Sequence, residues 1–388
     1  FFFFRRGHVG IPFLRNTFLG MLSLRYARAG AGVLSRGAAA SFHSGTVNHA
    51  SEGSVLMADD GTPRMKKQVH HASVPFPSFL KTPKTVAIIG APMIYGQPRP
   101  GTDFGPAQLR EAGMAKELKA LNWEVEDHGD IDIKPPHEDD PAMDQGRGTM
   151  RFGYCVGQAC KQVFDKVYTA ASEGKFALTL GGDHSIGAGT VAGILKARPN
   201  TGVIWVDAHA DINTPGVSDS GNIHGMPVAF LARLIDPTLV PGWEWMVDTP
   251  KLHPSQIVYI GLRDVDEAER MILKELGITC FTMQHVDRYG IGGVMERTLD
   301  QLHGRPLHCS YDVDAVDPLH APSTGTAVRG GLTFREANYV VEALSETGHL
   351  GSLDMVEVNP SLGSKTDNAV TVNMALALID SALGSRII

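Results

Sequence analysis

Short apolar runs alternate along most of this chain with segments that have the hydrophobic period of a helix. The runs lack polar alternation, so each predicts a strand that is buried on both faces of a sheet. Strands of this kind between helices predict an α/β fold with a parallel sheet. The predicted strands cover residues 86–90, 176–180, 202–206, 256–260, 278–282, 307–311 and 351–356, and residues 124–128 alternate weakly.

Helical periodicity separates most of these runs, and no linker or internal repeat divides them. The first helix opens with Pro106, a residue favoured in a first turn. The predicted helices cover residues 106–121, 153–171, 191–197, 266–276, 292–302, 333–345 and 367–383. We therefore predict a single α/β domain over residues 81–388.

The composition excludes several classes of protein. The 388 residues carry a formal net charge of −7, which argues against a basic face that binds nucleic acid. Only four cysteines are present, and Cys155 and Cys160 lack the spacing of a zinc or redox motif. We expect a soluble, globular, intracellular protein whose cysteines lie reduced in its core.

Residues 1–80 form an extension with a different composition. No Asp or Glu precedes Glu52, whereas arginines punctuate the stretch among small and hydroxylated residues. This pattern is typical of a mitochondrial transit peptide; the alternative is a stretch that the cell does not translate, with Met21 or Met57 as the first residue. Arginines interrupt the apolar runs, so no membrane span is predicted. We expect the protein in the cytoplasm, or in mitochondria if the extension is a transit peptide.

Three of the predicted strands end in groups of ionisable side chains. These groups lie in residues 181–185 (Gly-Gly-Asp-His-Ser), 207–213 (Asp-Ala-His-Ala-Asp-Ile-Asn) and 310–318 (Ser-Tyr-Asp-Val-Asp-Ala-Val-Asp-Pro). Residues two apart in an extended chain point the same way, so each Asp-x-His or Asp-x-Asp presents both side chains on one side. The carboxyl ends of parallel strands form the edge where ligands bind, so we expect the three groups to meet.

Four carboxylates gathered at one edge would repel one another or take up protons. Two divalent cations relieve this, since two imidazoles and four carboxylates can hold two metals if one or two carboxylates bridge. A set of ligands rich in oxygen and without thiolate suits Mn²⁺ better than structural Zn²⁺. A single Asp-x-His would be an ordinary turn, but three such groups predict a dinuclear site. No role is predicted for the other histidines of the body, among them His128, His253, His285, His303 and His308.

The three groups resemble the metal motifs of the ureohydrolases, and the segments between them resemble those of arginases. These segments are residues 220–225 (Ser-Gly-Asn-Ile-His-Gly), 261–266 (Gly-Leu-Arg-Asp-Val-Asp), 325–326 (Gly-Thr) and 357–363 (Glu-Val-Asn-Pro-Ser-Leu-Gly). The resemblance runs from residue 89 to the last helix, except for residues 137–148. It implies a three-layer α/β/α sandwich with a mostly parallel eight-stranded sheet.

The same resemblance implies two Mn²⁺ ions per chain and an assembly of subunits. The ligands of one ion would be His184, Asp207, Asp211 and Asp312. Those of the other would be His209, Asp207, Asp312 and Asp314, so that Asp207 and Asp312 bridge. A homotrimer, or a hexamer, is implied because Arg335 and Glu336 match a position that forms ion pairs between subunits.

The resemblance further implies hydrolysis of L-arginine to L-ornithine and urea, as in the urea cycle or in nitrogen catabolism. A hydroxide bridging the metals would attack the guanidinium carbon. Asp211 would pass a proton to the leaving nitrogen, and His224 would exchange protons with solvent. Glu357 would orient the guanidinium through a charge-assisted hydrogen bond.

Further residues resemble the arginase groups that bind the other end of the substrate. Asn213, Ser220 and Asn222 would hold the α-carboxylate. Asp266, and more remotely Glu269, would hold the α-ammonium. Thr326 would be a hydroxyl beside the metal ligands.

Three alternatives stay open at this point. An agmatinase would act on a substrate without a carboxylate and would have no use for Asn213, Ser220 and Asn222. A metal-free regulatory relative would need a broken ligand set. A deacetylase-like amidohydrolase would share the sheet but not the Ser-Gly-Asn-x-His segment.

Overall fold

The computed structural model describes residues 75–81, 84–137 and 150–386. The described residues all belong to one compact unit within residues 68–388, and residues 1–67 lie outside the described residues. Nearly all of the predicted extension, including the transit-peptide pattern, therefore falls outside them. The division at residue 80 stays a prediction. Among the described helices, none has the length and apolarity needed to cross a membrane.

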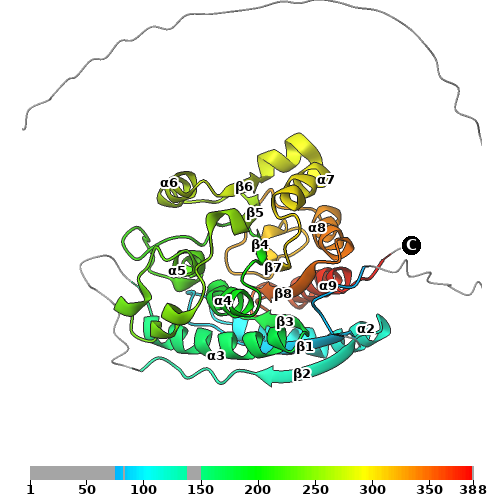
Figure 1. Cartoon of the computed structure of the whole chain (residues 1–388), viewed down its shortest axis with the longest axis horizontal. Helices are drawn as coiled ribbons and strands as arrows, with labels where there is room; N and C mark the ends of the chain where they lie inside the picture. Colours follow the sequence, from blue (N-terminus) through cyan, green and yellow to red (C-terminus); the bar gives the residue numbers. More distant parts are fainter. Residues whose placement is uncertain (1–74, 82–83, 138–149, 387–388) are drawn as a thin grey trace, which may run out of the picture. The chain divides into compact units, whose positions relative to one another are not determined.

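Eight strands form one sheet in the order β2-β1-β3-β8-β7-β4-β5-β6 (Figure 1). Each neighbouring pair is parallel, so the predicted α/β class is confirmed and the sheet is wholly parallel. Its central strands are buried along their whole length, as apolar runs without alternation predict. The strands are β1 (Thr85–Ala91), β2 (Glu124–Asp130), β3 (Phe176–Gly181), β4 (Gly202–Val206), β5 (Ile257–Leu262), β6 (Thr279–Thr282), β7 (Leu307–Asp312) and β8 (Leu350–Val356).

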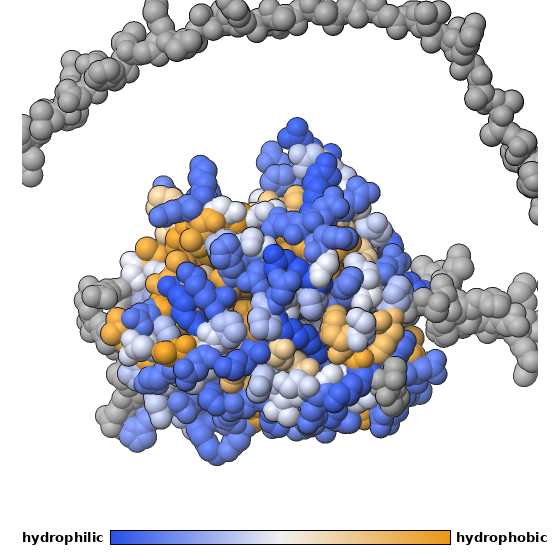
Figure 2. Space-filling view, in the orientation of Figure 1, coloured by the Kyte–Doolittle hydropathy of each residue, from blue (hydrophilic) through white to orange (hydrophobic). Residues whose placement is uncertain are grey.

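Helices cover both faces of the sheet and complete three layers (Figure 1). Apolar side chains of α3, α4, α5 and α6 pack into the core on one face, and those of α1, α2, α7, α8 and α9 pack into the core on the other. The helices are α1 (Gly105–Glu111), α2 (Met114–Ala120), α3 (Gly153–Ser172), α4 (Gly187–Ala197), α5 (Pro227–Leu231), α6 (Glu267–Leu276), α7 (Met283–Gln301), α8 (Phe334–Glu346) and α9 (Lys365–Ala382). Hydrophilic side chains dominate the face in Figure 2, with hydrophobic ones gathered in patches.

The helices differ from the prediction at four places, one of which is α4, which begins at Gly187, four residues before the predicted start at residue 191. The first predicted helix is two helices, because Gly113 adopts a φ of 97° between α1 and α2. Helix α7 begins nine residues before the predicted start at residue 292, and Gly290 breaks its helical backbone between Met283 and that point. Helix α5 was not predicted, since five residues are too few to show a helical period.

Residues 75–80, which were predicted to belong to the extension, pack against the α/β domain. The ring of Phe76 lies 6.2 Å from that of Trp123, and the guanidinium of Arg198 lies 4.8 Å above the ring of Phe79. Leu80 is buried in the same core. Residues 75–80 thus contribute to the packing of the α/β domain.

Two truncations should separate the extension from this segment. Removing residues 1–67 should leave the melting temperature unchanged, because the compact unit begins at Gln68. Removing residues 1–83 should lower it by at least about 5 °C, since the packing of Phe76, Phe79 and Leu80 is lost and each large apolar side chain contributes roughly 1.5–3 kcal/mol when buried. Thermal unfolding followed by circular dichroism would measure both. Equal melting temperatures for the two truncated chains would contradict this packing role.

Candidate active site

The four central strands carry the predicted site residues to one edge of the sheet. Strand β3 leads into η2 (His184–Ile186), β4 into Asp207, β7 into η7 (Val313–Ala315) and β8 into Glu357. Since β3, β8, β7 and β4 are neighbours and parallel, their carboxyl ends lie side by side. The sheet therefore brings together groups that are far apart in the sequence.

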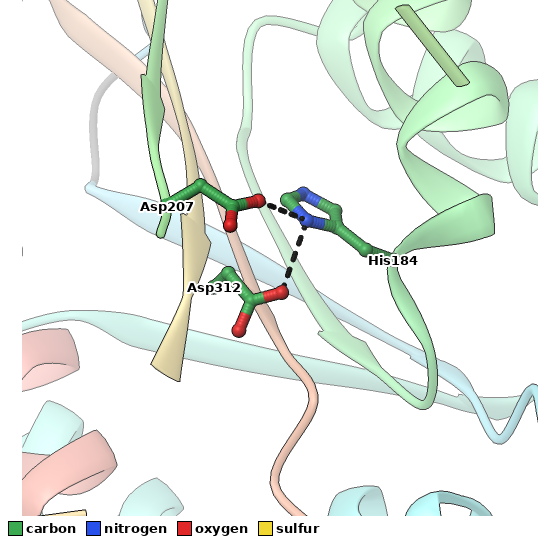
Figure 3. A group of neighbouring side chains, drawn as sticks. All are labelled: His184, Asp207 and Asp312. Atoms are coloured by element: carbon green, nitrogen blue, oxygen red, sulfur yellow. Dashed lines mark hydrogen bonds and ion pairs between the residues drawn. The ribbon is translucent and has the colours of Figure 1, made fainter. Parts of the chain in front are cut away.

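His184 lies at the centre of the first cluster. Its Nδ1 atom is 3.0 Å from Asp207 Oδ2, 3.1 Å from Asp211 Oδ2 and 3.2 Å from Asp312 Oδ2. Figure 3 shows the carboxylates of Asp207 and Asp312 turned toward the imidazole from neighbouring strands. All four side chains are buried. His184, Asp207 and Asp312 form a candidate site for one metal ion.

Asp207 also belongs to a second cluster. Its other oxygen, Oδ1, lies 3.4 Å from His209 Nδ1, and Asp314 Oδ2 lies 3.1 Å from the same nitrogen. Asp207, His209 and Asp314 form a second candidate site for a metal ion. One carboxylate thus faces both candidate sites, one oxygen to each, which is the arrangement that a bridging ligand requires.

Asp312 resembles Asp207 in its backbone contact, since Asp207 Oδ1 likewise accepts from the N–H of His209 at 2.7 Å, but it faces the imidazole of only one cluster. Its Oδ2 faces His184, but its Oδ1 accepts a hydrogen bond from the backbone N–H of Asp314 at 2.8 Å. This bond is part of the η7 turn and anchors Asp314 for the second site. The second, bridging role of Asp312 stays a prediction.

The geometry of the first cluster fits a cation. A ring nitrogen carries at most one hydrogen, so His184 Nδ1 cannot satisfy three carboxylate oxygens at once. The buried Oδ2 of Asp211 has no hydrogen-bond partner, and Asp211 adopts a φ of 51°. Ligand atoms about 2.1–2.5 Å from a divalent ion lie about 3 Å from one another, which is the distance found here between His184 Nδ1 and each of the three oxygens. A divalent ion among these atoms would satisfy all of them.

The protonation of the metal-free cluster shows the same excess of negative charge. Burial lowers the pKa of His184, but the three neighbouring carboxylates outweigh burial and raise this pKa well above its usual range. Burial and the charge of Asp207 raise the pKa of Asp211 to about 7. Burial together with Asp314 and Asp207 raises the pKa of Asp312 far above its usual range. Protons therefore gather on the cluster when no cations are bound.

Neighbouring groups orient the candidate ligands. Trp205 Nε1–H donates to Asp207 Oδ2 at 3.0 Å, and its ring stacks on His184 with centroids 4.1 Å apart. The hydroxyl of Thr326 donates to Asp314 Oδ2 at 2.8 Å, which places Thr326 beside the candidate ligands as predicted from the resemblance. These contacts hold the rings and carboxylates in position before any ion binds.

Arg263 holds the turn that carries Asp314, a role that was not predicted. Its guanidinium donates to the backbone oxygen of Asp314 at 2.6 Å, of Val328 at 2.8 Å and of Ala315 at 3.1 Å. An arginine can fix several carbonyls because its donors form a rigid fork. Only its place in the Gly-Leu-Arg-Asp-Val-Asp segment could have drawn attention to it.

Glu357 and His224 form a pair next to the first cluster. Glu357 adopts a φ of 62° directly after β8, and its Oε1 accepts from the backbone N–H of His184 at 2.9 Å. The same oxygen lies 3.2 Å from His224 Nδ1. Burial lowers the pKa of His224, but the hydrogen bond and charge of Glu357, with the charges of Asp211 and Asp183, raise it to about 9.

This pair should make the stability of the metal-free chain depend on pH. Because the folded pKa of His224 lies above its unfolded value of about 6.5, the pair stabilises fully below pH 6.5 and loses its effect as pH rises through 9. We expect the free energy of unfolding to fall over that range by at most about 3 kcal/mol. This fall should be absent from His224→Asn and present in His303→Asn, as measured by urea unfolding with a chelator. An identical pH slope in His224→Asn would contradict the assignment.

The substrate-binding residues predicted from the resemblance meet in one cavity of about 290 Å³. Side chains of both metal clusters and His224 line it as well, and no lysine or arginine lines it among the described residues. Glu357 is not among the lining residues but lies next to one of them, His224. The lining residues are His209, Asp211, Asn213, Ser218, Asp219, Ser220, Asn222, His224, Gly225, Asp264, Asp266, Glu269, Asp312 and Thr326.

Glu269 acts on this cavity through the backbone. Its Oε1 accepts from the N–H of Ile212 and its Oε2 from the N–H of Asp266, both at 3.1 Å, so it joins the loop after β4 to the start of α6. Asp266 in turn accepts from Asn213 Nδ2 at 2.9 Å. Burial and the charge of Asp211 raise the pKa of Glu269 to about 7. The remote position that we predicted for Glu269 thus has a geometric reason.

Four lining residues were missed, and one of them, Gly225, has no side chain to contribute. Ser218, Asp219 and Asp264 lie at the cavity, although no role was predicted for them. Asp264 could have been found, because it stands two residues before Asp266 in the same Asp-x-Asp spacing that identified Asp312 and Asp314. Ser218 and Asp219 lie in a loop, where spacing gives no direction for a side chain.

A parallel sheet whose strand ends gather two His/Asp clusters at an acidic cavity defines a hydrolase of the ureohydrolase class. A model of the arginase family matches residues 84–384. An arginase of Glaciozyma antarctica is 49% identical over 80% of this chain and 90% of its own length. The chain belongs to the arginase family, as its motifs predicted.

Solved structures agree with this assignment. Arginase from Bacillus caldovelox is 41% identical, with a TM-score of 0.71 over 79% of this chain and 100% of that one. Arginase from Entamoeba histolytica, solved in complex with L-ornithine, is 30% identical, with a TM-score of 0.68 over 78% of this chain and 98% of that one. The described body therefore corresponds to nearly the whole length of these relatives.

Proposed function

We propose that this chain hydrolyses L-arginine to L-ornithine and urea at a dinuclear manganese centre. The observation that carries the proposal is the pair of His/Asp clusters that share Asp207 and contribute His209, Asp211 and Asp312 to an acidic cavity. Membership of the arginase family supports the same reaction. The relative from Entamoeba histolytica was solved with L-ornithine, which is the amino acid product of this reaction.

The proposed ligands are His184, Asp207, Asp211 and Asp312 for one Mn²⁺ and His209, Asp207, Asp312 and Asp314 for the other. When bound, the two ions would supply an activated water as the nucleophile at neutral pH. Asp211 lines the cavity and would hand a proton to the leaving nitrogen of the substrate. His224 lines the cavity and would exchange that proton with solvent, since its imidazole lies beside Glu357, whose negative charge favours the protonated ring.

The shape and charge of the cavity suit a guanidinium. Its carboxylates, without a lysine or arginine among the described residues that line it, favour a planar cation. Asn213, Ser220 and Asn222 would hold the α-carboxylate through neutral donors, and Asp266 would hold the α-ammonium. Glu269 would position Asp266 and the loop of Asn213 rather than touch the substrate.

Urea release tests the proposal directly. A chain that begins at Met57, stripped of metal with a chelator, should release no urea from L-arginine and should regain activity when Mn²⁺ is added. Agmatine, which lacks the carboxylate, should be turned over at least about tenfold less efficiently, because the neutral donors of the carboxylate subsite then stay unpaired. Preference for agmatine would favour the agmatinase alternative. Less than one Mn per chain with no urea from either substrate would favour the metal-free relative.

We also propose a homotrimer or hexamer in the cytoplasm, or in mitochondria if the extension is a transit peptide. Within one chain Arg335 pairs with Glu342 at 2.6 Å, while Glu336 accepts from the N–H of Thr333 at 2.9 Å at the start of α8. Arg335 is well exposed, so it can exchange this partner for one on another subunit. Sedimentation of the intact chain would give its oligomeric state.

A further inference from the structure

A chain of buried polar groups begins behind His184, on the side away from the carboxylates. His184 Nε2 lies 2.9 Å from Ser310 Oγ on β7, and Ser310 Oγ lies 3.2 Å from Asp354 Oδ2 on β8. Ser310 and Asp354 face each other in the register of β7 and β8, so the sheet itself sets their contact. All three side chains are buried.

Only one arrangement of hydrogens lets His184 serve as a ligand through Nδ1. That atom must present its lone pair, so the ring hydrogen must lie on Nε2 and point at Ser310 Oγ. The Ser310 hydroxyl accepts this hydrogen and has its own hydrogen left to donate, which goes to Asp354 Oδ2. The carboxylate of Asp354, the last of these three groups, can only accept hydrogen bonds. It therefore fixes the direction of the bond from Ser310 and of the bond from His184.

Asp354 also contacts two other buried polar groups. The hydroxyl of Thr190 on α4 donates to the same Oδ2 at 2.5 Å, and His308 Nε2 lies 3.2 Å from it. Burying a carboxylate among hydroxyls in the middle of a sheet costs free energy that a packed apolar side chain would not. Its position one hydroxyl away from a candidate metal ligand accounts for its presence.

We propose that Asp354 is a positioning residue that acts through Ser310 to fix the tautomer and ring orientation of His184. The inference extends the proposed function, because it takes His184 as a metal ligand. His308, a histidine without a predicted role, lies between Asp354 and Ser352. Its Nε2 lies 3.2 Å from Asp354 Oδ2, and its Nδ1 lies 2.9 Å from Ser352 Oγ.

The test compares metal binding by four full-length chains. Ser310→Ala removes the relay hydroxyl, Asp354→Asn removes the anionic acceptor at nearly constant volume, and Ser352→Ala is the matched control. Ser352 is as buried as Ser310 and belongs to the same network, but it is not connected to His184 except through His308 and Asp354. Manganese affinity and stoichiometry would be measured by calorimetric titration of the metal-free chains and by elemental analysis after desalting.

We expect Ser310→Ala and Asp354→Asn to bind one of the two ions about 10–100-fold more weakly than the parent, while Ser352→Ala binds both like the parent. Parent-like affinity for both ions in Ser310→Ala and Asp354→Asn would overturn the inference. An equal loss of manganese affinity in Ser352→Ala would also overturn the inference, because the loss would then reflect disturbed packing and not the contact with His184. If Asp354→Asn fails to fold, Ser310→Ala decides alone, because it removes a single buried atom.

This experiment also separates the inference from the proposed function. A parent chain that binds two Mn²⁺ but releases no urea from L-arginine refutes the proposed reaction and leaves the positioning role to be decided by the variants. A parent chain that binds no Mn²⁺ refutes both.

Discussion

Replacing Asp207 with alanine should abolish urea release and leave less than one manganese ion per chain. Asp207 gives one oxygen to each cluster, at 3.0 Å from His184 Nδ1 and 3.4 Å from His209 Nδ1, so its removal opens both candidate sites at once. We expect kcat/KM to fall by more than about 10³-fold, since the activated water depends on both ions. Elemental analysis and a urea assay on the same preparation would measure the two effects.

Asp312→Ala should have the same outcome for activity and metal content. Its loss removes an oxygen 3.2 Å from His184 Nδ1 and also frees the N–H of Asp314, which holds the second cluster in place. Asp132→Ala, at an exposed position outside the site, is the control and should keep two ions and full activity. Retained activity in Asp207→Ala or Asp312→Ala would contradict the bridging assignment.

Glu357→Gln should raise KM and lower kcat together, with kcat/KM reduced by about 10²–10³-fold. Glu357 holds two groups at once, the N–H of His184 at 2.9 Å and Nδ1 of His224 at 3.2 Å, and the resemblance gives it the guanidinium as a third. The amide keeps the shape but loses the charge that strengthens these bonds, and orientation serves both binding and turnover.

Steady-state kinetics at saturating Mn²⁺ would separate this effect from metal loss. Glu275→Gln on the exposed face of α6 is the control and should behave like the parent. A change in KM alone would mean that Glu357 binds the substrate without aligning it for attack. Unchanged kinetics would remove Glu357 from the site.

The fold could be predicted because the sheet is parallel and buried. Strands β4 and β5 are unbroken apolar runs, and their lengths set their bounds within two residues. The local details were not predicted: Gly113 separates α1 from α2 through a positive φ, and the five residues of α5 are too few to repeat a hydrophobic period. Periodicity carries no information about a single glycine or about five residues.

The site residues that could be predicted are the ionisable residues that directly follow a predicted strand. Asp207, His209 and Asp211 follow β4 directly, and the strand gives their side chains a direction. The strand order that brings Asp312 beside His184 could not be derived, since parallel strands adjacent in the sheet are distant in the sequence. Family resemblance implied that these two residues share a metal ion, but it did not supply the strand order.

Residues that act through others were the hardest to predict. Arg263 and Asp354 lie in or beside quoted motifs, yet their roles depend on backbone oxygens and hydroxyls contributed by other strands and loops. Sequence spacing describes one strand at a time. A contact between β7 and β8 needs the register of both, which only the three-dimensional structure provides.

The position of β8 in the sheet determines when this protein can fold and bind metal. The last strand of the chain lies between β3 and β7, so until residues 350–356 are synthesised the two halves of the sheet have no common edge. Until then, a nascent chain on the ribosome exposes the unpaired edges of β3 and β7, and it cannot assemble the candidate metal site. We expect chaperone dependence and slow, post-translational folding, with manganese taken up only after release.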